Sequence, residues 1–123
     1  MPTVSTQDTI TLAVSVTDRA RTAAWFTQHF GFKEVFSIEE AGWTELATNT
    51  PGVTLGFGDA ESVTPSSTVP VFGVADCDAA RSALEAEGVR FDGETLVIPD
   101  MVKLATFFDP DGNPFMLAQT LSA

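Results

Sequence analysis

Cysteine and basic residues are scarce in this sequence of 123 residues, and each scarcity excludes a class of function. The one cysteine, Cys77, cannot form an intrachain disulfide, and no CxxC pair is present to hold zinc. Six basic residues stand against 17 acidic ones, which gives a net charge of −11. Nucleic acids and anionic membranes attract proteins rich in Lys and Arg, so we expect neither as a partner.

Long apolar runs are also absent from the sequence. No stretch approaches the ~18 apolar residues of a transmembrane helix, and the polar residues 1–8 do not resemble a signal peptide. With 44% hydrophobic and 19% charged residues, the composition is that of an ordinary globular protein. We therefore expect a single cytoplasmic domain. The acidic excess favours solubility, and it would also attract a cationic ligand.

The clearest local motif is the stretch from Leu104 to Gln119, LATFFDPDGNPFMLAQ. Apolar runs flank a turn in which Asp109 can accept backbone hydrogen bonds, Pro110 fixes its own φ and Gly112 tolerates a positive φ. This combination predicts a β-hairpin.

The sequence repeats one order of predicted elements. Alternating residues predict a first strand at 10–16, and an apolar stripe at helical spacing predicts a helix between Asp18 and Gly31. Three further strands are predicted at 32–38, 43–48 and 53–58.

After the polar segment 59–68 the order begins again. It comprises a strand at 69–74, a helix that begins at Asp76 or Asp78 and ends at Gly88, and strands within 89–98, 102–108 and 114–119. The sequence thus predicts an α+β fold of two βαβββ modules, at about 8–58 and 69–119, joined by the linker 59–68.

This duplicated order, together with the strand-DPDGN-strand motif, resembles the glyoxalase / bleomycin-resistance / extradiol-dioxygenase superfamily, also called the vicinal oxygen chelate proteins. The resemblance covers essentially the whole chain. It implies that the two modules form an open, U-shaped mixed sheet around a cavity. It also implies a homodimer, because small members of the family usually pair.

The resemblance implies a metal site with one ligand from each of four strands. Counting from the helix caps and the hairpin turns places these four positions at Thr11, Gly56, Val69 and Met116. None of them offers the imidazole, carboxylate or thiolate that zinc, iron, nickel or manganese binds. We therefore expect no metal and no cofactor, which weakens every metal-dependent activity of the family.

Small residues share the face of these four positions, and they would either leave room for a ligand or let another element pack closely. If Leu46, Leu104 and Phe108 pack under the helices, the side chains that point toward the cavity are Trp43, Glu45, Lys103 and Phe107. The two aromatic rings suit a planar ligand, and Lys103 suits a carboxylate. Glu45 suits a cation or the role of a general base, and it could equally be a solvated strand residue.

The first functional hypothesis is a metal-free small-molecule-binding protein that sequesters an antibiotic or metabolite, its ligand being aromatic or cationic. One alternative is a metal-independent isomerase or lyase with Glu45 as general base. Another is an accessory protein whose sheet is filled by a partner. A last alternative is a glyoxalase-type metalloenzyme, which would hold if the four ligand positions were misplaced.

Overall fold

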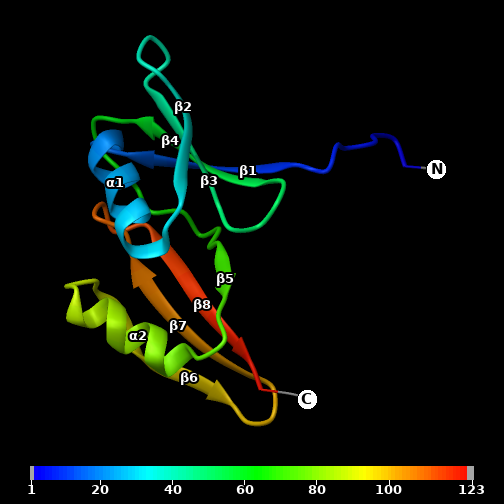
Figure 1. Cartoon of the computed structure of the whole chain (residues 1–123), viewed down its shortest axis with the longest axis vertical. Coiled ribbons are helices and arrows are strands. Elements are labelled where there is room, and N and C mark those ends of the chain that lie inside the picture. Colours follow the sequence, from blue (N-terminus) through cyan, green and yellow to red (C-terminus); the bar gives the residue numbers. More distant parts are fainter. Residues whose placement is uncertain (1, 122–123) are drawn as a thin grey trace. The chain divides into compact units, whose positions relative to one another are not determined.

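The computed structural model describes residues 2–121, and the chain divides into two compact units, residues 1–63 and 64–123. Each unit contains one helix and a four-stranded mixed sheet (Figure 1). The predicted α+β fold of two βαβββ modules is confirmed. No helix within residues 2–121 is long and apolar enough to span a bilayer.

In the first unit the chain order is β1 (Ile10–Val16), α1 (Arg19–Phe30), β2 (Lys33–Ile38), β3 (Trp43–Ala47) and β4 (Val53–Asp59). The strands lie in the order β1-β4-β3-β2, and β1 runs parallel to β4. Helix α1 begins after Asp18, whose carboxylate accepts a hydrogen bond from the backbone N–H of Arg21, and it ends at Gly31, which has a φ of 71°. Both limits are those that the sequence predicted.

The core of the first unit lies between α1 and one face of its sheet. Successive strand residues point to opposite faces, so only every second residue reaches this core. The strand side chains that are fully buried there are Val16, Leu46, Leu55 and Phe57, and α1 contributes the fully buried Phe26. We call the opposite face the helix-free face of the first sheet; it carries Thr11, Ala13, Ser15, Trp43, Glu45, Thr54, Gly56 and Gly58.

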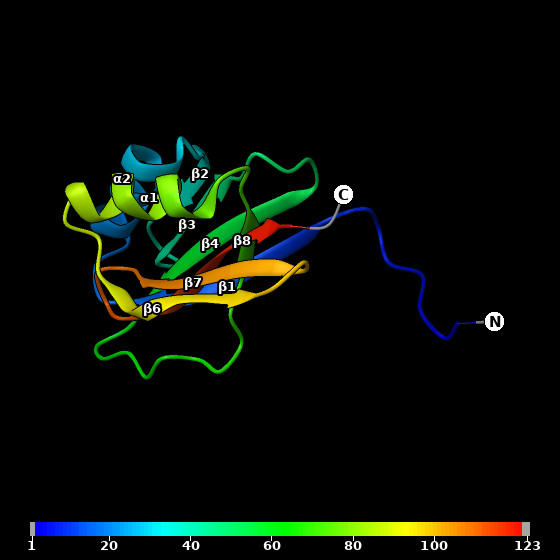
Figure 2. The same ribbon diagram turned by 90° about the horizontal axis from the view of Figure 1, so that it is seen from below.

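In the second unit the order is β5 (Val71–Gly73), α2 (Cys77–Ala86), β6 (Phe91–Ile98), β7 (Val102–Phe108) and β8 (Pro114–Thr120). The strands lie in the order β5-β8-β7-β6, and α2 lies on one face of this sheet (Figure 2). Strand β5 is shorter than predicted. Asp76 rather than Asp78 caps α2, because its carboxylate accepts a hydrogen bond from the backbone N–H of Ala79.

The predicted turn between β7 and β8 is held by the buried carboxylate of Asp109. Its Oδ1 accepts hydrogen bonds from the backbone N–H groups of Asp111 and Asn113, each at 2.9 Å, and its Oδ2 accepts one from Asn113 Nδ2. Burial raises the pKa of Asp109, and these hydrogen bonds offset part of that rise. The folded state therefore binds this proton more tightly than the unfolded chain, so ionisation of Asp109 costs stability as the pH rises above its ordinary pKa.

Replacing Asp109 by Ala should lower the free energy of unfolding by about 3 kcal/mol, because three donors lose their acceptor. Urea unfolding would measure the change. Asp109→Asn keeps one acceptor oxygen and serves as the matched variant, with a smaller expected loss. Equal stability of Asp109→Ala and the unmodified protein would show that the carboxylate does not hold the turn.

Candidate functional site

The indole ring of Trp43 lies across two glycines on the helix-free face of the first sheet. A Cβ built on Gly56 would lie 2.0 Å from Cζ2 of Trp43, whereas one built on Gly58 would lie 3.6 Å from Cε3. The first distance is impossible and the second is an ordinary contact. Position 56 therefore accepts only glycine as long as Trp43 keeps this orientation.

Glu45 lies beside this ring and is held by it. The Nε1–H of Trp43 donates a hydrogen bond to Oε1 of Glu45 at 3.0 Å. Glu45 stands opposite Gly56 on one side and Phe36 on the other, and Trp43 stands opposite Ile38. Phe36 and Ile38 are 40% and 43% exposed. One face thus combines an indole ring, a carboxylate and exposed apolar side chains. Trp43 and Glu45 lie opposite the face of Leu46, as predicted, and their contact with a ligand stays a prediction.

Two hydroxyl groups lie on the same face, between β1 and β4. Thr11 stands opposite Thr54, and their Oγ1 atoms are 2.8 Å apart. Thr11 therefore has a neighbouring hydroxyl as its polar partner rather than a carboxylate or imidazole. These hydroxyls add hydrogen-bonding capacity to the part of this face where the neighbouring side chains of β1 and β4 are small.

The four predicted ligand positions do not fit the metal that the resemblance implies. The indole of Trp43 covers Gly56, Val69 precedes β5, and Met116 stands between Val71 and Thr106 in the second sheet. No group of three or more His, Cys, Asp or Glu side chains in residues 2–121 is placed to hold a metal ion. Hydroxyl and thioether groups are poor donors for the family's metals.

The expected orientation of Lys103 and Phe107 is wrong, because both side chains face α2. Phe107 is fully buried and its ring stacks on Phe115, with the ring centres 5.7 Å apart. Lys103 Nζ lies 2.6 Å from Oδ2 of Asp78 on α2, and this hydrogen bond raises the pKa of Lys103. Leu104 and Phe108, which were expected to pack under the helix, alternate with them and lie on the other face of β7.

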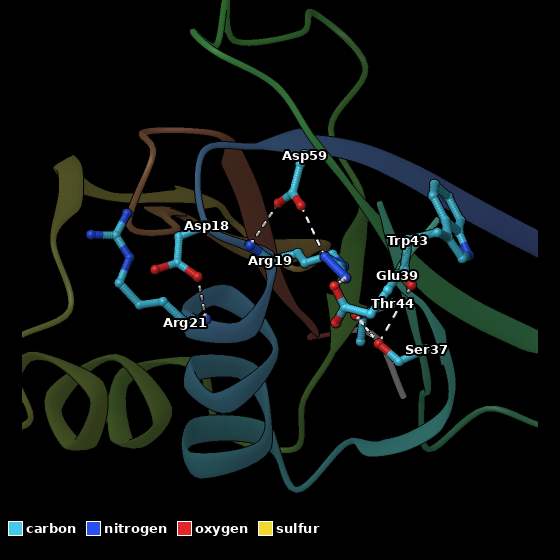
Figure 3. A network of polar contacts seen from close by, with 8 residues as sticks. All are labelled: Asp18, Arg19, Arg21, Ser37, Glu39, Trp43, Thr44 and Asp59. Carbon is cyan, nitrogen blue, oxygen red and sulfur yellow. Dashed lines mark hydrogen bonds and ion pairs between the residues drawn. The ribbon is translucent and has the colours of Figure 1, made fainter. Parts of the chain in front are cut away.

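A groove that the sequence did not predict lies beside α1, on the other face of the first sheet. This groove has a volume of ≈ 800 Å³, and its lining comes from α1, β2, β3 and the end of β4. At one end, Arg19 Nη1 and Nη2 lie 2.9 Å from Asp59 and Glu39 respectively (Figure 3). The alternation of β3 separates the groove from the indole, because Thr44 points into the groove and Trp43 points away from it (Figure 3).

Replacing Gly56 by Ala should displace the indole and destabilise the protein by about 2 kcal/mol, because overpacking forces a shift of the ring or the strand. Gly58→Ala is the matched control and should change stability by less than about 1 kcal/mol, since its Cβ makes an ordinary contact. Thermal unfolding and tryptophan fluorescence would measure both variants. Equal behaviour of the two would contradict the close contact at Gly56.

Several solved structures share this fold. A member of the glyoxalase/bleomycin resistance protein/dioxygenase superfamily from Sphaerobacter thermophilus has a TM-score of 0.77 and 20% identity. The match covers 90% of this chain and 95% of that protein. An antibiotic-binding protein from a Streptomyces species has a TM-score of 0.75 and 23% identity, covering 98% and 99%. A fosfomycin resistance protein from Listeria monocytogenes, complexed with manganese(II) and sulfate, has a TM-score of 0.73 and 20% identity, covering 95% and 91%.

At these identities the likeness shows the fold alone. No curated protein matches the sequence. The family model of the Glyoxalase/Bleomycin resistance protein/Dioxygenase superfamily matches residues 8–117, which is most of the chain. The protein belongs to the Glyoxalase/Bleomycin resistance protein/Dioxygenase superfamily.

Proposed function

We propose that this protein is a metal-free small-molecule-binding protein of its superfamily, and that it binds an aromatic or cationic ligand on the helix-free face of the first sheet. The observation that carries the proposal is the indole of Trp43, which lies over Gly56. It fills the space that a metal-binding side chain at position 56 would need. It also supplies an aromatic surface where the family would place a ligating group.

The chemistry of this face suits a planar cation. An indole ring attracts planar groups by stacking and attracts cations through its π-face. Glu45 adds a negative charge whose position is set by its hydrogen bond to Trp43. Thr11 and Thr54 provide hydroxyl groups for a polar substituent of the ligand.

The second unit contains further residues that the family resemblance singles out, and they are considered apart from the first sheet. Val69 and Met116 occupy the positions of the second unit that correspond to Thr11 and Gly56, and a ligand contact there stays a separate prediction. Lys103 and Phe107 are left out because they face α2. The likeness to the antibiotic-binding protein from Streptomyces supports sequestration of an antibiotic or metabolite. A homodimer in the cytoplasm is part of the same proposal and rests on the family resemblance and the sequence.

The sequence has two tryptophans, Trp25 and Trp43. In the variant Trp25→Phe, Trp43 is the only indole, and its fluorescence reports on ligand binding. Planar cations should quench the fluorescence of this variant. At a ligand concentration of 100 Kd they should stabilise it by about 2.7 kcal/mol, measured as a rise in the melting temperature. A panel of planar cationic, neutral and anionic compounds that leaves both signals unchanged would contradict the proposal.

Glu45→Gln should weaken the binding of a planar cation about tenfold, because the nearby negative charge is lost while the indole remains. A neutral planar analogue should bind both forms equally, and this comparison is the control. If the protein instead turns over a substrate and Glu45→Gln abolishes turnover without loss of fold, the alternative of a metal-independent isomerase or lyase would replace ours.

Protein purified without a histidine tag or chelator should contain far less than one equivalent of transition metal per subunit, because the four positions lack donors. Elemental analysis after incubation with zinc, iron, nickel and manganese would measure this. A metal content of about one equivalent per subunit would contradict the proposal and indicate a metalloenzyme of the family.

A further inference from the structure

The groove beside α1 is separate from the face on which the proposed function rests. Trp43 points away from it, whereas Ser37 and Thr44 point into it (Figure 3). Its volume of ≈ 800 Å³ lies within the ~300–1,000 Å³ that is typical of small-molecule sites. All of its lining residues belong to the first unit.

The groove exists because α1 presents small side chains beside β2. Ala20, Ala23 and Ala24 line the helix side, and every residue of β2 is exposed. Leu46, which is fully buried, contributes an apolar floor. Larger side chains on α1 would fill this space, so these alanines set its width.

The polar lining is rich in hydroxyls and carboxylates. Ser37 Oγ and Thr44 Oγ1 lie 2.6 Å apart on the sheet side. The charged groups that line the groove are one guanidinium, of Arg19, and four carboxylates, of Asp18, Glu34, Glu39 and Asp59. The groove therefore carries an excess of negative charge. Glu34 has no ion-pair partner among residues 2–121, and its carboxylate remains available to a cation.

Arg19 closes one end of the groove, and one of its donors is not satisfied. Its side chain is 10% exposed, and its Nη1 and Nη2 atoms are paired with Asp59 and Glu39. The buried Nε–H has no hydrogen-bond partner in the part of the chain that the structure describes. A buried donor without an acceptor is costly, and an oxygen atom of a ligand would relieve that cost.

We propose that this groove binds a polyhydroxylated organic amine, such as an amino sugar. The ammonium group would pair with Glu34 and with the free oxygen of Glu39. The hydroxyl groups would exchange hydrogen bonds with Ser37 and Thr44, and one ligand oxygen would accept from Arg19 Nε. A plain polyamine lacks the acceptor oxygens, and an uncharged sugar lacks the charge that the carboxylates select.

The test uses the full chain, with the disaccharide of glucosamine as probe and cellobiose as the uncharged comparator. NMR amide shifts would locate binding, and calorimetry would measure affinity, at a mildly acidic pH that keeps the amines protonated. We expect the glucosamine disaccharide to shift the amides of Ala24, Ser37 and Thr44. Cellobiose should bind at least about fivefold more weakly.

Three variants separate a built site from diffuse attraction by an acidic protein. Glu34→Gln should weaken binding about fivefold, whereas Glu61→Gln, which removes the same charge outside the groove, should not change it. Ala24→Leu fills the groove at an exposed position without altering charge, and it should abolish binding. Equal effects of the Glu34 and Glu61 variants, or full binding by Ala24→Leu, would overturn the proposal.

The outcomes also distinguish this proposal from the one for the helix-free face. Shifts that centre on Trp43 and are lost in Glu45→Gln would assign the amine to that face and overturn the groove site. Binding at the groove that persists in Glu45→Gln would support the groove, whatever the fate of the planar ligand.

Discussion

A β-strand sends successive side chains to opposite faces, and this constraint determines both the helix-free face and the groove of the first unit. Along β3, Trp43 and Glu45 reach the helix-free face, while Thr44 and Leu46 reach the face that carries α1. Four consecutive residues therefore supply an aromatic and acidic surface on one side, and a hydroxyl and an apolar floor on the other. A shift of register by one residue would exchange the two sets.

Some parts of the fold and of the site could be predicted from the sequence, and others could not. The element order, the caps at Asp18 and Gly31 and the turn at Asp109 depend on local chemistry, and local chemistry is written in the sequence. The face on which Trp43 and Glu45 lie was predictable because the apolar Leu46, which follows Glu45, marks the core face of β3. In β7 every residue from Leu104 to Phe108 is apolar or small, apart from Thr106, so the pattern did not identify the core face.

A difference of one residue between the two hairpins decides the orientation of β7. Ala47 pairs with Thr54 across residues 48–53, whereas Phe108 pairs with Pro114 across residues 109–113. A residue of β4 and its counterpart in β8 are therefore separated by a fixed number of positions in the sequence. For β3 and β7 that number is larger by one. This is why Lys103 and Phe107 face α2. The groove beside α1 was missed for a different reason, since it depends on the packing of α1 against β2 and not on a motif.

The contact between Trp43 and Gly56 also constrains how this site can change during evolution. A side chain at position 56 has no room while the indole is present, so any residue that could bind a metal there is excluded until Trp43 is lost. Loss of Trp43 alone would leave Glu45 without its hydrogen-bond donor and expose the glycines beneath. The two positions are thus epistatic, and a return to metal chemistry would have to pass through an intermediate with neither an aromatic surface nor a metal ligand.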